Sequence, residues 1–482
     1  MSQHGRRPDI FLIVLDCLRA DRVQLCDGRR QIMPHLDRFC QTATVFERAF
    51  SVAPWTVPSH ASIFTGHYPP AHRVQHGHLT LDCEARTLAE VLSDAGYHTI
   101  GICANPHVSA SRLFDRGFAE YHEMWRGKGP AHRVVDKARH VAQRAKLSLD
   151  SRLEATSLPV RLSDRRAWHC DHGTRARLIN RRLARSLQQA PDTPRFVFLN
   201  YLEAHLPYAM VPPFYRISMP DAHLVRRALR LNQDPRLHTA TGAGMGPEEF
   251  ELLGRRYDAA VHYLDFRLGE ALQIIQAVGD LDRSLVIVTS DHGENLGDHG
   301  LMDHQYCVYD SLLRVPLAVK WPGEARTERV STPVESVDLY GCVLSVAELS
   351  NQSPLGPGAR AADRARPTYA AYASPLPDML PWLDRYPSFD VSAYDHDLLS
   401  IRCEEMKLIV SSRGGRELYD TVADPGETTD LSARMPELTE RLHQSLNRWR
   451  SELPVVGRAQ HEPQADFDSD DTLRHLRGLG YA

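Results

Sequence analysis

The feature that most constrains the fold of this chain is a series of short, nearly continuous apolar runs. They lie at residues 9–15, 98–103, 196–201, 285–290 and 315–321. Each run is rich in β-branched or aromatic residues and is shorter than a core helix, which is typical of strands buried on both faces. We interpret the first four runs as parallel strands of one sheet, and 315–321 as a candidate fifth.

Amphipathic stretches lie between these runs. Residues 87–95 end at Gly96, a common helix stop, and residues 248–275 carry apolar side chains at helical spacing. Because strands alternate with helices, we expect an α/β fold with a doubly wound, mostly parallel sheet flanked by helices.

The 482 residues divide into regions of different composition. Segment 356–366 is a Pro/Gly/Ala/Arg-rich linker. After it, 367–373 and 408–412 resemble strands, and 436–453 resembles a helix. We therefore expect a catalytic α/β domain over 1–355 and a smaller α+β subdomain over 356–482. Within the first, the arginine-rich stretch 126–185 is interpreted as a solvated helical insertion; binding of an anionic substrate, a nucleic acid or a membrane surface are the alternatives.

The net charge and the cysteine content limit the expected binding partners and cellular location of the protein. The formal net charge is −4, which gives no reason to expect a nucleic-acid partner. Nine cysteines without a CxxC pair favour reduced thiols. The continuous apolar run 11–15, which follows Arg6 and Arg7, is shorter than the ~7–15 residues of a signal peptide, and no stretch approaches the ~18 residues of a membrane helix. We expect a cytoplasmic protein without a membrane span; nothing in the sequence indicates its oligomeric state.

Ligand-type residues follow two of the expected strands. Asp16 comes directly after the first run, and Asp291 with His292 follows the run 285–290. Ligands of open α/β sheets bind outside the carboxyl ends of strands, and this oxygen–nitrogen set suits zinc, manganese or a similar divalent ion. The alternative is that each aspartate caps a helix or a turn.

A third element is the segment PWTVPSHASIFTG at residues 54–66. Pro58 suits the first turn of a helix, which would place Thr56 at or just before the helix start. There a hydroxyl meets free N–H groups and the positive end of the helix dipole, and a metal ion beside it would produce a nucleophile. The alternative is that Thr56 is an N-cap.

Together these residues resemble the sulfatase family of the alkaline-phosphatase superfamily. The family signature, Cys or Ser-x-Pro-x-Arg followed by Thr-Gly, is similar to Thr56–His60 followed by Thr65-Gly66. Asp16 corresponds to the family's strand-end metal ligand, and Asp291-His292 to its later metal pair. Segments 311–316, 417–431 and 476–481 resemble further family segments. The resemblance implies a metal-dependent enzyme acting on sulfate or phosphate esters.

The chain departs from the family pattern at three positions. Thr56 replaces the residue that true sulfatases convert to formylglycine, and oxidation of threonine would give a ketone rather than that aldehyde. His60 replaces the signature arginine. Cys17 replaces a second strand-end aspartate, although a thiolate could bind a soft metal.

The set Asp16, Thr56, Asp291 and His292 is similar to the one-metal site of relatives that form a phosphothreonine. These include lipoteichoic-acid synthases and phosphoethanolamine transferases, which are membrane-anchored. Nucleotide pyrophosphatases also use threonine but have a second metal site, and we find no convincing Asp-x-x-x-His segment for one here.

Family members also carry histidines and lysines that grip the ester oxygens and protonate the leaving group. By resemblance, His107, with Asn105 in place of a family lysine, His205 and His304 occupy such positions. Histidine titrates near neutral pH, which suits either role.

The resemblance thus implies a small anionic substrate and one divalent ion, which could be Mn, Zn, Ca or Mg. We predict Asp16, Thr56, Asp291 and His292 as metal ligands, and the following as catalytic residues: Thr56, His60, His107, His205 and His304. The first interpretation is a hydrolase or transferase of phosphate (di)esters working through a covalent Thr56 intermediate. The alternatives are a sulfuric-ester hydrolase or sulfuryl transferase with unmodified threonine, and a non-catalytic binding protein derived from a sulfatase.

Overall fold

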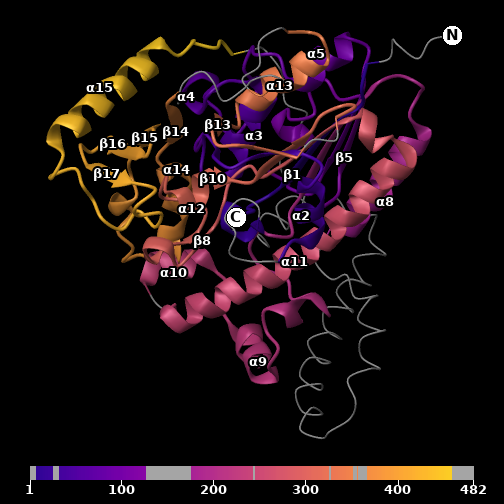
Figure 1. The fold of residues 1–482 in the computed structure, drawn as a ribbon. Helices are drawn as coiled ribbons and strands as arrows, with labels where there is room; N and C mark the ends of the chain where they lie inside the picture. Colours follow the sequence, from indigo (N-terminus) through magenta and orange to yellow (C-terminus); the bar gives the residue numbers. More distant parts are fainter. Residues whose placement is uncertain are drawn as a thin grey trace, which may run out of the picture.

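A computed structural model describes residues 7–24, 32–125, 175–242, 245–324, 327–350, 355 and 366–458 (Figure 1). Within these ranges, a central sheet has eight strands in the order β12-β2-β11-β7-β1-β6-β4-β5. Their bounds are β1 (Ile10–Leu15), β2 (Thr44–Phe46), β4 (His98–Cys103), β5 (Glu120–Glu123), β6 (Arg195–Tyr201), β7 (Leu285–Thr289), β11 (Leu317–Lys320) and β12 (Glu328–Val330).

The sheet is mostly parallel, as the apolar runs predict. Strand β1 lies near its middle and pairs in parallel with both β6 and β7, so that Leu15 lies opposite Tyr201. The expectation that 315–321 is a parallel strand is wrong, because β11 runs antiparallel to its neighbours β7 and β2. In the described segment between β7 and β11, the only α-helix is the four-residue α12 (Asp310–Leu313), too short to carry the chain back for a parallel strand.

Helices cover both faces of this sheet. Ile10, Leu12 and Val14 of β1 share one apolar core with α3 (Thr56–Thr65), α5 (Leu88–Asp94) and α13 (Asp338–Val346). Phe11 and Ile13 point to the opposite face. There the core includes side chains of α2 (Pro34–Cys40), α8 (Ala176–Gln189) and α11 (Pro247–Val278). Both predicted helices, 87–95 and 248–275, are therefore present as α5 and α11, and the doubly wound α/β fold is confirmed.

The C-terminal part forms a second, antiparallel sheet of four strands with one long helix. Its elements are β14 (Thr368–Tyr372), β15 (Leu398–Cys403), β16 (Met406–Ser411), β17 (Arg416–Asp420) and α15 (Pro436–Glu452). Leu442 and Leu446 of α15 pack on one face of this sheet, whereas Tyr372 on the other face joins the core around α3. The proposed domain boundary at 355/356 falls in a segment largely outside the described residues, and it remains a prediction.

Smaller elements complete the framework. They are β3 (Ala49–Phe50), β8 (Asn295–Leu296), β9 (Met302–Asp303), β10 (Arg314–Val315), β13 (Val334–Glu335), α4 (Pro69–His72), α9 (Ala222–Arg230), α10 (Pro235–Thr241) and α14 (Leu376–Met379). Most of the basic insertion, 126–174, lies outside the described residues, and 176–185 belongs to α8. No helix in the described part of the chain has the length and apolar character needed to cross a membrane.

Candidate active site

The ends of β1 and β7 meet at the carboxyl edge of the sheet. Asp16 follows β1 directly, and Asp291 follows β7 after a single residue, so their fully buried side chains lie on adjacent loops. The backbone N–H of Cys17 donates to Asp291 Oδ1 at 3.3 Å and ties the two loops together. The strand-end pattern in the sequence therefore brings the predicted ligands to one place.

Thr56 is the first residue of α3 and is fully buried. Trp55 occupies the N-cap position without a side-chain hydrogen bond, so the alternative of Thr56 as N-cap is not observed. Thr56 Oγ1 lies 3.2 Å from His292 Nε2. A hydrogen bond from Ser59 Oγ to the Asp291 carbonyl, 2.7 Å, holds the first turn of α3 against the β7 loop.

Two asparagines that were not among the predicted site residues complete this arrangement. Asn105 Nδ2 donates to Asp16 Oδ2 at 2.8 Å and also lies 3.4 Å from Thr56 Oγ1. Asn200 Nδ2 donates to the same Asp16 oxygen at 3.1 Å. Asn105 follows β4 and Asn200 lies within β6, so their positions near strand ends are the signal that could have identified them.

The electrostatics of this cluster suit a bound cation. Burial and the neighbouring Asp16 raise the pKa of Asp291 well above its usual value. Burial also acts to raise the pKa of Asp16, but His205, His292 and other neighbours outweigh it and lower that pKa. Asp291 Oδ2 is buried without a hydrogen-bond donor among the described residues. Two buried carboxylates beside an imidazole and a hydroxyl fit a divalent ion, which would offset their mutual repulsion.

His292 is oriented for metal binding. Its Nδ1 lies 2.8 Å from the Gly293 carbonyl, which requires the proton on that nitrogen and leaves the Nε2 lone pair directed at Thr56 Oγ1 and Asp291. Metal-binding histidines usually donate their second N–H to a carbonyl or carboxylate in this way.

His60 lies against the Thr56 carbonyl and His107 against the neighbouring Trp55 ring. His60, one turn further along α3, has Nδ1 3.0 Å from the Thr56 carbonyl and 3.4 Å from Asp291 Oδ2. Burial lowers the pKa of His60. The His107 ring meets the Trp55 ring edge-on at 6.5 Å, and its Nδ1 contacts the Arg112 guanidinium. Burial and Arg112 lower the pKa of His107 well below its usual value, so both imidazoles are neutral near pH 7.

His304 lies next to His292, and His205 lies next to His304. The His304 ring centroid is 4.5 Å from that of His292 and 4.8 Å from that of His205. His304 Nδ1 is 2.7 Å from Asp303 Oδ1 and 3.4 Å from Glu294 Oε1. Burial alone would lower the pKa of His304, but Asp303 and Glu294 outweigh it and raise that pKa well above its usual value. Sequence reasoning identified neither carboxylate.

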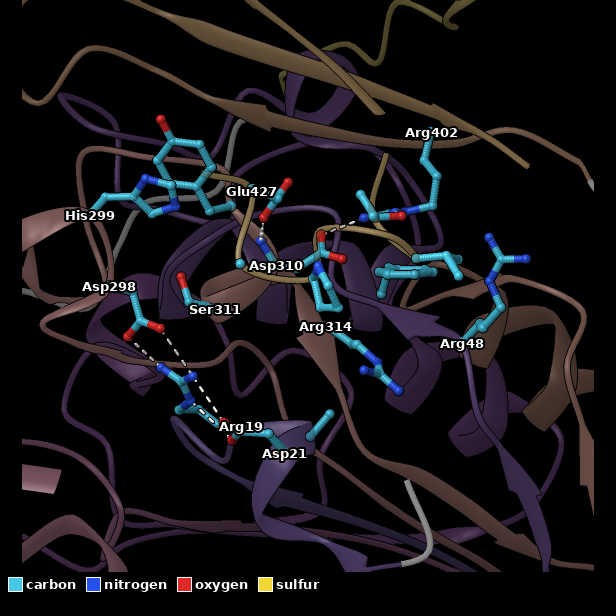
Figure 2. Close-up of a pocket in the computed structure, with 17 residues that line it drawn as sticks. Arg19, Asp21, Arg48, Asp298, His299, Asp310, Ser311, Arg314, Arg402 and Glu427 are labelled. Atoms are coloured by element: carbon cyan, nitrogen blue, oxygen red, sulfur yellow. Dashed lines mark hydrogen bonds and ion pairs between the residues drawn. The ribbon is translucent and has the colours of Figure 1, made fainter. Parts of the chain in front are cut away.

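A separate polar pocket of about 450 Å³ lies between the main sheet and the C-terminal sheet (Figure 2). None of the predicted site residues lines it. Its Arg19 already pairs with Asp21 and Asp298, and its Arg402 pairs with Asp310. Because Arg19 and Arg402 are paired with aspartates of the same pocket wall, they are not available to an anionic ligand. We therefore place the candidate active site at the Thr56 cluster.

Comparison with known proteins shows the family of this chain. The family model described as "Sulfatase" matches residues 8–349. The chain belongs to the sulfatase family. Among curated sulfatase-family relatives, the uncharacterized sulfatase YidJ of Escherichia coli is 25% identical over 92% of this chain and 86% of its own length. The multifunctional alkaline phosphatase superfamily protein PehA of Trinickia caryophylli is 25% identical over 66% of this chain and 69% of its own length.

Two solved structures share this fold. The phosphonate monoester hydrolase of Agrobacterium radiobacter superimposes with a TM-score of 0.67 at 20% identity, covering 92% of this chain and 96% of that one. A protein solved with its substrate D-glucosamine-2-N,6-O-disulfate gives 0.66 at 18% identity, covering 92% and 98%. The chain is thus an enzyme of the sulfatase family. Members of this family are ester hydrolases, and they generally depend on divalent metal ions.

Proposed function

We propose that this sulfatase-family enzyme cleaves or transfers a phosphate (di)ester through a covalent intermediate on Thr56. The observation that carries the proposal is the position of Thr56 Oγ1. It lies at the buried N-terminus of α3, 3.2 Å from His292 Nε2, in contact with the amide that also binds Asp16. A threonine here favours phosphoryl transfer, because it cannot provide the formylglycine aldehyde of true sulfatases.

Four residues would hold one divalent ion, which is Mn, Zn, Ca or Mg. They are Asp16, Thr56, Asp291 and His292. Such an ion, when bound, lowers the pKa of a hydroxyl and offsets negative charge on an ester oxygen. The unbonded Asp291 Oδ2 and the Nε2 lone pair of His292 support this ligand set.

The chain's own groups divide the remaining work. Thr56 Oγ gives up its proton to solvent and attacks phosphorus in line; the new Oγ–P bond forms, and the P–O bond to the alcohol breaks. His304, whose protonated form Asp303 stabilises, or His205 gives a proton to the leaving oxygen. His60, beside the Thr56 carbonyl, and His107, beside Trp55, would donate hydrogen bonds to the charge that develops on the ester oxygens. Water or an acceptor alcohol then attacks phosphorus and gives its proton to the deprotonated histidine, while the Oγ–P bond breaks and Thr56 Oγ regains a proton from solvent.

A sulfuric ester is the second candidate substrate. Several curated relatives are named as sulfatases, including the choline-sulfatase of Rhizobium meliloti, 23% identical over 88% of this chain and 82% of its own length. Sulfate monoesters and phosphodiesters each carry one negative charge, so both fit the same set of buried groups.

The test is a panel of three probes: 4-nitrophenyl phosphate, bis(4-nitrophenyl) phosphate and 4-nitrophenyl sulfate. We expect turnover of a phosphate probe, and a loss of roughly 10³-fold or more in kcat for Thr56→Ala, because the nucleophile is removed. Thr65→Ala is the matched control, since Thr65 is a buried threonine at the other end of α3. Unchanged melting temperatures would show that both variants fold.

The outcomes separate the three functions. Turnover of the sulfate probe alone would replace the first candidate by the second. Retained activity in Thr56→Ala would exclude the covalent mechanism for either ester. A protein that binds one metal ion per chain and turns over no probe would be a binding protein.

A further inference from the structure

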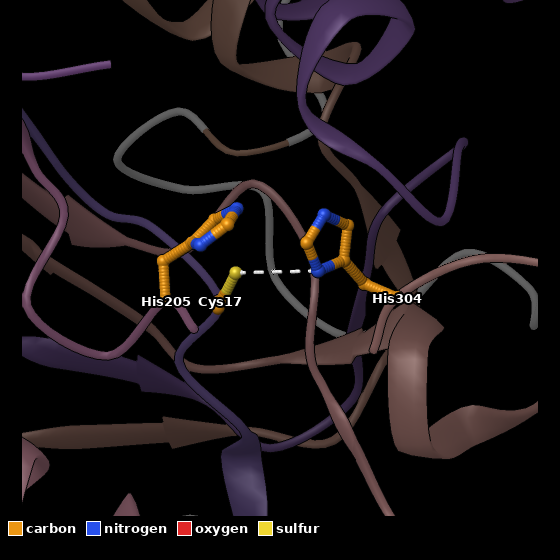
Figure 3. A group of neighbouring side chains, drawn as sticks. All are labelled: Cys17, His205 and His304. Carbon is orange, nitrogen blue, oxygen red and sulfur yellow. Dashed lines mark hydrogen bonds between the residues drawn. The ribbon is translucent and has the colours of Figure 1, made fainter. Parts of the chain in front are cut away.

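Cys17 faces two imidazoles in a buried cluster next to the proposed catalytic metal site. Figure 3 shows the Cys17 thiol between the rings of His205 and His304. Sγ lies 3.8 Å from His304 Nδ1, and one ligand atom from each of the three residues lies within 4.8 Å of the others. All three side chains are buried.

We propose that Cys17, His205 and His304 form a second metal site, which takes a soft divalent ion such as zinc. Zinc bonds of about 2.3 Å to sulfur and about 2.0–2.1 Å to nitrogen place tetrahedral ligands about 3.5 Å apart. The observed sulfur–nitrogen distance of 3.8 Å is close to this spacing. One thiolate with two imidazoles is a ligand set that favours zinc over magnesium or calcium.

Two carboxylates can complete the coordination. Glu294 and Asp303 both lie beside His304 Nδ1, at 3.4 and 2.7 Å, and the three form a second group of potential ligands. Glu294 is fully buried, with the Tyr208 hydroxyl and His304 as its polar neighbours. A buried carboxylate is costly unless it is paired with a positive charge, and an ion in this cluster would pair with it.

The backbone holds the thiol in this direction. Cys17 has a φ of +61°, which non-glycine residues rarely adopt. Its carbonyl accepts a hydrogen bond from Tyr257 Oη at 2.7 Å, and its N–H donates to Asp291. Strained backbone of this kind concentrates at functional sites.

This second site shares no ligand with the set Asp16, Thr56, Asp291 and His292. It goes beyond the proposed function and changes one step of it. With an ion bound there, His205 and His304 hold a cation, and the leaving oxygen takes its proton from solvent instead of from these histidines. The attack of Thr56 is unchanged.

The test is loading of the metal-free full-length chain with Co²⁺. A cobalt–thiolate bond gives a charge-transfer absorption in the near ultraviolet, which oxygen and nitrogen ligands do not give. We expect two cobalt ions per chain by elemental analysis, together with this absorption. Cys17→Ser should lose the absorption and one ion. Cys103→Ser, a change in another buried cysteine, should keep both.

Thr56→Ala separates the two proposals, because it should abolish turnover and leave the thiolate absorption in place. Wild-type protein with a single cobalt ion and no thiolate absorption would overturn the second site. If such protein still showed Thr56-dependent turnover, the proposed function would stand. Persistence of the thiolate absorption in Cys17→Ser would also overturn the second site. If that variant fails to fold, the spectrum of the wild-type protein alone tests the proposal.

Discussion

At the scale of single residues, Asn105 and Asn200 hold the Asp16 carboxylate in place. Their side-chain amides donate to one oxygen of Asp16, at 2.8 and 3.1 Å. Asn105 also lies 3.4 Å from Thr56 Oγ1, so one amide orients both the proposed ligand and the proposed nucleophile. Groups that orient ligands in this way contribute strongly to metal affinity.

Asn105→Ala should therefore weaken binding of the catalytic ion by roughly 10–100-fold, because Asp16 loses its shorter hydrogen bond. Competition with a chelator measures this affinity. Asn447→Ala on the exposed side of α15 is the control and should leave it unchanged. Equal affinities in wild type and Asn105→Ala would show that the amide does not orient the site.

The sequence signals the strand-end residues of the candidate site better than the side chains that surround them. Asp16, Asp291 and His292 follow apolar runs directly, and a carboxylate at a strand end is an unusual signal. An asparagine at a strand end is not such a signal, because asparagine is also common in turns. Glu294 and Asp303 follow no periodic pattern. Their proximity to His304 arises only when the β8–β9 hairpin folds back on the end of β7.

At the scale of elements, α2 depends on a cap from another helix. Its N-cap residue Met33 has no capping side chain. Asp265 of α11 accepts hydrogen bonds from the backbone N–H groups of His35 and Leu36, at 2.9 and 2.8 Å. Burial nevertheless raises the pKa of Asp265 to about 7.

This raised pKa makes a testable difference to stability. Asp265 binds a proton more tightly in the folded chain, so its contribution is fully present below its unfolded pKa of about 4 and is lost as the pH rises towards 7. Asp265→Asn removes this pH-dependent loss of stability, because the amide does not ionise. We expect the difference in melting temperature, variant minus wild type, to be larger at pH 8 than at pH 5. A difference that is the same at both pH values would contradict the raised pKa.

Element type is predicted from the sequence more reliably than strand direction. The four runs read as parallel strands are β1, β4, β6 and β7, because continuous apolar runs report burial on two faces. The direction of β11 depends on a connection without a crossover helix, which apolarity does not reveal. Strands β2, β5 and β12 are three or four residues long, too short for a pattern to develop.

At the scale of the whole molecule, a buried ion pair joins the C-terminal sheet to the catalytic core. Lys407 of β16 lies 2.8 Å from Asp310 of α12 and 2.7 Å from Glu427. Its side chain is 1% exposed. Asp310 follows His304 by six residues, so this contact supports the segment that carries the site.

Lys407→Met should destabilise the protein by roughly 3–5 kcal/mol, because it leaves Asp310 and Glu427 buried without this partner. Urea unfolding measures the loss. The double variant Lys407→Met/Asp310→Asn should recover part of it, since one of the two charges is removed. Equal stability of the single variant and wild type would show that the contact does not hold the two sheets together.

The shared core also limits what the sequence shows of domain organisation. A linker composition predicts a boundary at 355/356, yet Tyr372 and Leu398 pack in the same core as Trp55 and Val57. Composition reports the change in chain character, whereas packing between distant segments has no local signature.

The most direct test of the central claim is a crystal structure of the metal-loaded protein with anomalous scattering data. We expect an ion bound by Asp16, Asp291 and His292, with Thr56 Oγ1 about 2.0–2.2 Å from it, as for an oxygen ligand of zinc. An ion held by these side chains with Thr56 Oγ1 outside bonding distance would contradict the assignment of Thr56 as the metal-activated nucleophile.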